Sequence, residues 1–175
     1  MKRTRNTLLI LTTVILLLSC SPVEKSEKER LSEIYSQAIR MYRQGDPIRF
    51  CSEDNLSIHS LTDSYRMLEY QDWKTTVRYM PEVEEETWKS LLQVESQHVP
   101  ISPDLDIGYH YVLVDDVPSS TCTYRFSQVG FNENQDQALV VLTVQYEDFY
   151  SGSLYLFKLV DGQWKAKEEL LLWIT

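Results

Sequence analysis

The spacing of apolar residues after residue 26 predicts a helix over Glu27–Gln44. Apolar side chains recur there at intervals of three and four residues, which places them on one helix face; they are Leu31, Ile34, Tyr35, Ala38, Met41 and Tyr42. Ser26 and Glu29 fit a capping box at the start, and Gly45 followed by Asp46-Pro47 ends the pattern. We interpret the tyrosine and methionine stripe as core packing rather than as a ligand site.

The next part of the chain gives weaker signals. An extended piece is expected around residues 48–52, a second helix from Thr62 to about Trp73, and a third from Pro81 to about Glu95. Proline and acidic residues both suit the first turn of a helix. The run of Glu82, Glu84, Glu85 and Glu86 is read as a solvated helix start rather than as a cation site.

From Tyr109 onward the apolar pattern favours strands. The predicted strands are residues 109–116, 123–131, 137–146, 151–160 and 163–174. Asp161-Gly162 between the last two is a strong signal for a tight hairpin turn. The expected fold class is therefore α+β, with N-terminal helices (residues 27–97) followed by an antiparallel β-meander of four to five strands (residues 108–175). Together they form a single globular domain over residues 27–175.

The N-terminal apolar run, Leu8–Leu18, is far shorter than the ~20 residues that a membrane-spanning helix needs. Three basic residues and no acid precede it, as is typical of a secretory signal peptide. The last two residues of the run and the two that follow, Leu17-Leu18-Ser19-Cys20, resemble the lipobox of bacterial lipoproteins. This resemblance implies removal of residues 1–19, lipidation of Cys20 and N-acylation of the new terminus. An uncleaved anchor, or an ordinary signal peptide with a chance cysteine, is the alternative.

The same resemblance predicts the cellular location of the mature protein. Residues 20–26 become a lipidated cysteine and a short spacer, and the protein is exported and anchored to a membrane through the lipid. Ser21 directly after Cys20 favours sorting to the outer membrane of a Gram-negative bacterium.

The net charge of the chain limits the classes of molecule that the protein is expected to bind. The whole chain has a formal net charge of −9, and loss of the three basic residues of the signal makes it −12. Such an acidic protein is a poor partner for nucleic acid or for anionic lipid headgroups. With Cys20 lipidated, Cys51 and Cys122 are left as a pair, which suits a disulfide in an exported protein. Two buried free thiols are the alternative.

The C-terminal third carries a further recognisable pattern. Its elements are Phe126-Ser127-x-Val129-Gly130-Phe131, Ala138-Leu139-Val140, Asp161-Gly162-x-Trp164-Lys165 and Trp173-Ile174. This pattern resembles a group of uncharacterised bacterial lipoproteins over about residues 122–175. The resemblance implies an exported α+β lipoprotein and no particular activity. We expect Gly130 and Gly162 to serve turns, and the two tryptophans to pack in the core or on the sheet.

Motifs for chemistry are scarce. The histidines, His59, His98 and His110, are dispersed and lack the paired spacing of a helical zinc site. No nucleophile elbow and no phosphate-binding glycine loop occurs. We therefore predict no catalytic residue, no metal site and no cofactor.

Two hypotheses about function follow. The first is a binding or protein-interaction module of the cell envelope, tethered through Cys20, that holds a partner protein or a small ligand. Its predicted binding surface is aromatic and comprises Tyr109, Tyr111, Tyr146, Tyr150, Tyr155 and Trp164. The second is a hydrolase with a dispersed site of histidine and carboxylate, for which His98 and His110 are the candidates.

Overall fold

The computed structural model describes residues 25–45, 56–62, 68, 71–94, 98–116 and 121–175. The helices are α2 (Glu27–Gly45), α3 (Trp73–Tyr79) and α4 (Glu85–Val94). The strands are β1 (Leu56–His59), β2 (Val112–Val114), β3 (Cys122–Phe126), β4 (Gly130–Phe131), β5 (Gln137–Tyr146), β6 (Phe149–Val160) and β7 (Gln163–Ile174). The predicted signal segment, Cys20 and Cys51 lie outside the described residues.

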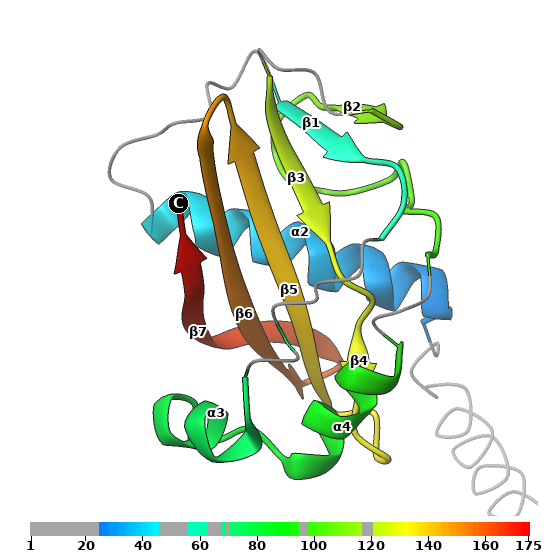
Figure 1. The fold of residues 1–175 in the computed structure, drawn as a ribbon. Coiled ribbons are helices and arrows are strands. Elements are labelled where there is room, and N and C mark those ends of the chain that lie inside the picture. Colours follow the sequence, from blue (N-terminus) through cyan, green and yellow to red (C-terminus); the bar gives the residue numbers. More distant parts are fainter. Residues whose placement is uncertain (1–24, 46–55, 63–67, 69–70, 95–97, 117–120) are drawn as a thin grey trace, which may run out of the picture.

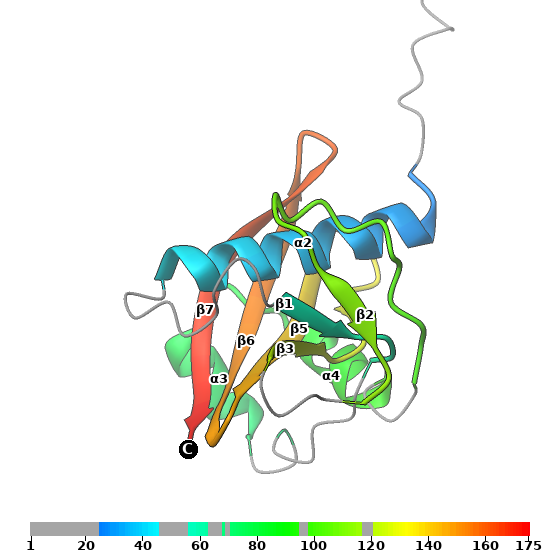
Figure 2. The same ribbon diagram turned by 90° about the horizontal axis from the view of Figure 1, so that it is seen from above.

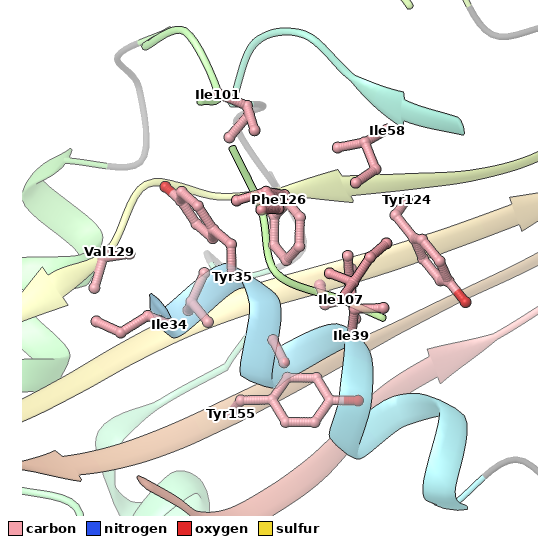
Figure 3. Packing of buried hydrophobic residues seen from close by; sticks show 14 of the residues in the cluster. Ile34, Tyr35, Ile39, Ile58, Ile101, Ile107, Tyr124, Phe126, Val129 and Tyr155 are labelled. Carbon is pink, nitrogen blue, oxygen red and sulfur yellow. The ribbon is translucent and has the colours of Figure 1, made fainter. Parts of the chain in front are cut away.

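The described elements form three layers, with one sheet between two layers of helices. Helix α2 crosses one face of the sheet, and α3 and α4 lie against the other face (Figures 1 and 2). Each face has its own apolar cluster: Tyr155 and Trp164 pack on the α2 side, whereas Leu139 and Leu156 pack on the α4 side. Side chains of α2, β3 and β6 converge on the α2 side of the sheet (Figure 3). The central strand β5 contributes to both clusters, which explains its continuous apolar run over residues 138–142.

The antiparallel part of the sheet confirms the predicted meander in its main strands. β3, β5, β6 and β7 are neighbours in antiparallel pairing, and β5 and β7 have the predicted bounds. Asp161 and Gly162 both have positive φ, +54° and +73°, and join β6 to β7 in a two-residue hairpin. A second two-residue turn, Glu147-Asp148, joins β5 to β6, so β6 begins two residues before the predicted strand.

The prediction of a purely antiparallel meander after the helices is wrong. The described sheet has seven strands and is mixed, because β1 pairs in parallel with both β2 and β3. β1 precedes α3 and α4, so the helices are not all N-terminal. Its four residues, LSIH, are too few to show a strand period, and only pairing with distant strands stabilises them.

Two predicted strands are shorter or broken. The strand expected over residues 109–116 is reduced to β2, and the strand expected over residues 123–131 is divided into β3 and β4. At the break, Ser127 N–H donates to the Val141 carbonyl (2.9 Å), and Val141 N–H donates to Ser127 Oγ (2.9 Å). A side-chain oxygen thus replaces a carbonyl in the ladder, which allows β4 to leave the line of β3.

Helix α2 confirms the predicted helix and its start. Ser26 N–H donates to the Glu29 carboxylate (2.7 Å), and Glu29 N–H is 3.3 Å from Ser26 Oγ, as in a capping box. Ile34, Tyr35 and Ala38 are buried, as the stripe predicts. The Tyr35 ring lies 4.5 Å from the Phe126 ring, centroid to centroid, and fixes α2 on β3.

The other two helices differ from their predicted ranges. The helix expected from Thr62 to Trp73 is wrong where the structure describes it, since α3 begins only at Trp73 and is capped by Asp72. The third helix begins at Glu85 rather than at Pro81. Its first turn is held by the buried Gln137 of β5, whose side-chain oxygen accepts from Glu84 N–H (2.7 Å) and from Thr87 Oγ1 (2.9 Å). A cap from another element has no local sequence signal.

Candidate binding groove

A polar groove of about 750 Å³ lies between α2 and the segment 102–106. The segment that precedes β2 passes beside α2 in the view from above (Figure 2). Helix α2 and the two residues before it supply most of the lining. The described lining residues are Lys25, Ser26, Lys28, Glu29, Ser32, Glu33, Ser36, Gln37, Arg40, Ser102, Asp104, Asp106 and Gln163.

The helical period places one wall of the groove. Glu29, Ser32, Glu33, Ser36 and Arg40 recur every three or four residues, so they share one polar face of α2. The neighbouring apolar face is buried on the sheet. One amphipathic helix therefore both anchors the core and presents the groove.

Alternation in the segment after Pro100 places the other wall. Ile101, Leu105 and Ile107 are buried in the core, whereas Asp104 and Asp106 point into the groove. The Tyr111 hydroxyl accepts from Leu105 N–H (2.8 Å) and donates to the Pro103 carbonyl. The sequence reads as a linker here, but core burial and these bonds fix its shape.

Three ion pairs line the groove. Lys25 pairs with Glu33 (2.7 Å), Lys28 with Asp104 (3.3 Å) and Arg40 with Asp106 (2.7 Å). Ser32 Oγ also donates to the Asp104 carbonyl (2.8 Å), which ties the two walls together. Pairs that are as exposed as Lys28–Asp104 contribute only ~0–1 kcal/mol, so a ligand can displace them at little cost.

Backbone N–H groups donate to two carboxylates of this wall, those of Glu29 and Glu33. The hydrogen bond from Ser26 N–H lowers the pKa of Glu29 below its ordinary value. Glu33 accepts from Trp164 N–H (3.1 Å) on the exposed side of β7. Negative and positive groups thus occupy defined positions along the same groove.

The predicted aromatic surface is not one surface. Tyr155 and Trp164 are both 0% exposed and belong to the core, because their strand positions face α2. Tyr146 and Tyr150 are half-buried near the β5–β6 turn, where Tyr150 stacks on Trp173. This part of the prediction is therefore wrong for the two core residues.

Tyr109 and Tyr111 do lie together, beside the β2 edge. They line a shallow depression with Pro103, His110 and Val112. The Arg43 guanidinium lies 4.2 Å from the centroid of the Tyr109 ring, which holds this tyrosine against the end of α2.

The histidines have structural neighbours or lie apart. Both ring nitrogens of His59 are 2.9 Å from backbone carbonyls, those of Leu61 and Asp115, and His98 Nδ1 is 2.8 Å from the Thr62 carbonyl. Among the described residues that line the depression with His110, none carries a carboxylate. No group of metal-binding side chains occurs in the described part of the chain. Among the described residues, none of these contacts joins a histidine to a carboxylate, and the hydrolase hypothesis stays a prediction.

The acidic residues at the start of α4 contact different partners, and all four are exposed, as expected for a solvated helix start. Glu82 pairs with Lys158 (2.7 Å), Glu84 accepts from Asn132 Nδ2 (2.8 Å) and Glu85 pairs with Lys89 (3.0 Å). The Lys158 ammonium holds the pKa of Glu82 below its ordinary value.

Cys122 is buried and takes part in a disulfide. Its partner lies outside the described residues, so pairing with Cys51 stays a prediction. In the residues that the structure describes, no helix is long and apolar enough to cross a membrane.

Sequence reasoning missed the groove. The polar stripe of α2 was the only local signal, and such a stripe is ordinary for a surface helix. Residues 98–104, which include part of the opposite wall, have the composition of a linker. The alternation of buried and exposed positions there spans too few residues to indicate burial.

Comparisons with known proteins add no family. No protein-family model matches the chain, and no curated protein or solved structure is similar enough to count as a match.

Proposed function

We propose that this protein is a lipid-anchored binding module of the cell envelope that holds a polar partner in the α2 groove. The observation that carries the proposal is the set of three ion pairs along a groove of about 750 Å³. A groove of this size accommodates a small ligand or a short peptide segment.

The lining defines the chemistry of the partner. Positive and negative side chains alternate with hydroxyl and amide groups, and the described lining contains no aromatic residue. A partner that carries both charge signs, such as a polar peptide segment, can replace each internal pair with an intermolecular one. An apolar ligand would leave these groups without partners and is disfavoured.

The position of the groove fits a membrane-tethered role. Lys25 lines the groove, and Cys20 lies five residues earlier in the chain. Five extended residues span at most ~18 Å. Lipidation of Cys20 would therefore hold the groove close to the membrane surface, and we place this surface at the outer membrane of a Gram-negative bacterium.

Co-purification of the lipidated protein from membranes tests the proposal. Lys28→Glu reverses a charge in the groove, and Lys89→Glu is the matched control. Lys28 and Lys89 side chains are 64% and 65% exposed, and each pairs with one carboxylate on the surface. We expect a stoichiometric partner or bound solute with the wild type and with Lys89→Glu, and its loss with Lys28→Glu. Equal recovery from both variants would contradict the groove as the binding site.

A Cys20→Ala variant separates the tether from the groove. We expect it to lose membrane association, measured by fractionation and by the mass of the N-terminal peptide. Unchanged membrane association of this variant would contradict the lipid anchor.

A further inference from the structure

The β7 strand is an outer strand of the described sheet and has two unlike halves. In its first half, side chains of α2 bond to the outward-facing backbone. Trp164 N–H donates to Glu33 Oε1 (3.1 Å), the Trp164 carbonyl accepts from Gln37 Nε2, and Ala166 N–H donates to Gln37 Oε1 (3.4 Å). Two side chains of one helix therefore close this part of the sheet edge.

The second half of β7 has no such cover among the described residues. In an antiparallel pair, the residues that bond to the partner strand alternate with residues whose N–H and C=O point away. Tyr150 and Thr175 exchange both backbone bonds (2.8 and 3.2 Å), which sets this alternation at the end of β7. Combined with the register of β6 and β7, it directs the backbone groups of Glu169, Leu171 and Ile174 outward.

Two of the three outward residues, Leu171 and Ile174, are exposed and apolar. Leu171 is 54% exposed and Ile174 is 61% exposed. Open sheet edges are usually protected by lysine, by proline, by a β-bulge or by a covering element. β7 has a bulge at Leu172, between the paired residues Leu171 and Trp173, so Glu169 and Leu171 lie before the bulge and Ile174 lies after it. Lys167 stands at the start of this half, but Glu168–Thr175 contains neither a lysine nor a proline.

Charge distinguishes the possible occupants of this edge. Glu169 is exposed at the start of this edge, and the exposed turn Glu147-Asp148 directly precedes β6, whose Tyr150 bonds to Thr175 just after β7. The whole chain is acidic, with a formal net charge of −9. A second copy would bring like charges together, whereas a strand with basic side chains would neutralise them.

We propose that the open edge of β7, Glu169–Ile174, binds an extended basic segment of another protein as an added strand. The backbone groups of Glu169, Leu171 and Ile174 supply the ladder bonds. Leu171 and Ile174 contact apolar side chains of the segment, and Glu169 pairs with its lysine or arginine. This surface is separate from the α2 groove and does not depend on the function proposed for it.

Fluorescence polarisation with a labelled peptide tests this surface on the full lipidated protein in detergent. The probe is a capped peptide in which valine alternates with threonine and lysine. We expect saturable binding to the wild type, weakened by roughly tenfold or more in Leu171→Lys and in Ile174→Lys. Val112→Lys is the matched control at the opposite edge, since Val112 is 56% exposed on β2, and it should bind as the wild type does.

Two further comparisons identify the chemistry. Glu169→Gln keeps an acceptor for the Tyr155 hydroxyl, which lies 2.9 Å from Glu169 Oε1, but removes the charge, so it should weaken binding of the lysine peptide. A peptide N-methylated on the groups that face β7 cannot form the ladder and should not bind. The groove variant Lys28→Glu should bind the peptide normally, which separates failure here from failure of the groove.

Several results would overturn the proposal. They are absence of binding to the wild type, equal binding to Leu171→Lys, and equal binding of the N-methylated peptide. A dimer of the wild type that Leu171→Lys dissociates in sedimentation would assign the edge to a second copy instead.

Discussion

Gly130 makes the closest contact between α4 and the sheet, and replacing it with alanine should separate them. A Cβ at this position would lie 2.3 Å from Leu91 N and 2.5 Å from Leu91 Cα. Ordinary contact begins at 3.4 Å, so the shortfall is about 1.1 Å, and it is against backbone rather than against a movable side chain. We had expected Gly130 to serve a turn, but its φ is not positive, and close approach is its role.

The cost follows from what α4 carries. Moving α4 outward disturbs Trp88 and Leu91, which are 3% and 0% exposed, and stretches the bond from Phe131 N–H to Ser90 Oγ (3.1 Å). Forcing an extra carbon into a packed core costs ~1–3 kcal/mol, and a clash with backbone places this substitution at the upper end, ~3 kcal/mol. The smaller entropy of the unfolded alanine chain offsets ~0.4–1 kcal/mol of this. We expect a loss of about 2 kcal/mol in the free energy of unfolding, which lowers Tm by roughly 4–8 °C in a domain of this size.

Urea unfolding monitored by tryptophan fluorescence measures this loss, and amide exchange locates it. Exchange should accelerate in α4 and stay unchanged in the β6–β7 hairpin. Gly162→Ala is the control: its Cβ meets no atom within 4 Å, so it carries only the strain of a positive φ, about 1 kcal/mol. If Gly130→Ala unfolds within about 0.5 kcal/mol of the wild type, which is the usual range for surface substitutions, close packing of α4 on β4 is refuted.

Three more predictions concern polar contacts. Gln137→Leu should cost about 3 kcal/mol in urea unfolding, because it leaves buried donors at the start of α4, including Glu84 N–H, without an acceptor; a loss under about 1 kcal/mol would contradict this cap. Burial and the nearby Glu82 raise the pKa of Glu168, so its ionisation opposes folding at neutral pH and this cost disappears as the pH falls below about 4. Glu168→Gln should therefore raise Tm at pH about 7, with a gain that closes toward acid; a pH-independent gain would refute the electrostatic cause. Gln37→Ala should open the first half of β7 and cost about 1 kcal/mol in urea unfolding, and an unchanged free energy of unfolding would contradict this cover.

Local patterns were enough for the elements whose period repeats several times. α2 has about three turns of apolar spacing, from Leu31 to Tyr42, and a capping box. β7 begins directly after a turn whose residues tolerate positive φ. β5 has a continuous apolar run over residues 138–142 and polar turns on both sides, which together indicate a strand. In each of these segments, nearby residues determine the structure.

The remainder depends on contacts between distant residues. β1 is a strand only because β2 and β3 lie on either side of it, and α4 begins where Gln137 of β5 can cap it. The break after β3 depends on the Ser127 hydroxyl facing Val141. No window of neighbouring residues contains these pairs.

The candidate surfaces were harder to predict for the same reason. The aromatic residues chosen from the sequence were too generic. Strand position places Trp164 in the core, whereas Tyr109 lies before β2 and is 39% exposed. The groove forms only where α2 and the segment 102–106 lie side by side. The open half of β7 begins after Ala166, because Glu33 and Gln37 bond to the backbone only up to that residue.

Site-specific photocrosslinking in the membrane tests the groove most directly. Gln163 and Gln93 are both exposed glutamines, but Gln163 lines the groove, whereas Gln93 lies on α4 outside it. With a photoreactive residue at each position in turn, we expect one discrete adduct from Gln163 that disappears in the Lys28→Glu background, and none from Gln93. The same adduct from both positions, or none from Gln163 in intact membranes, would contradict a binding module that acts through the α2 groove.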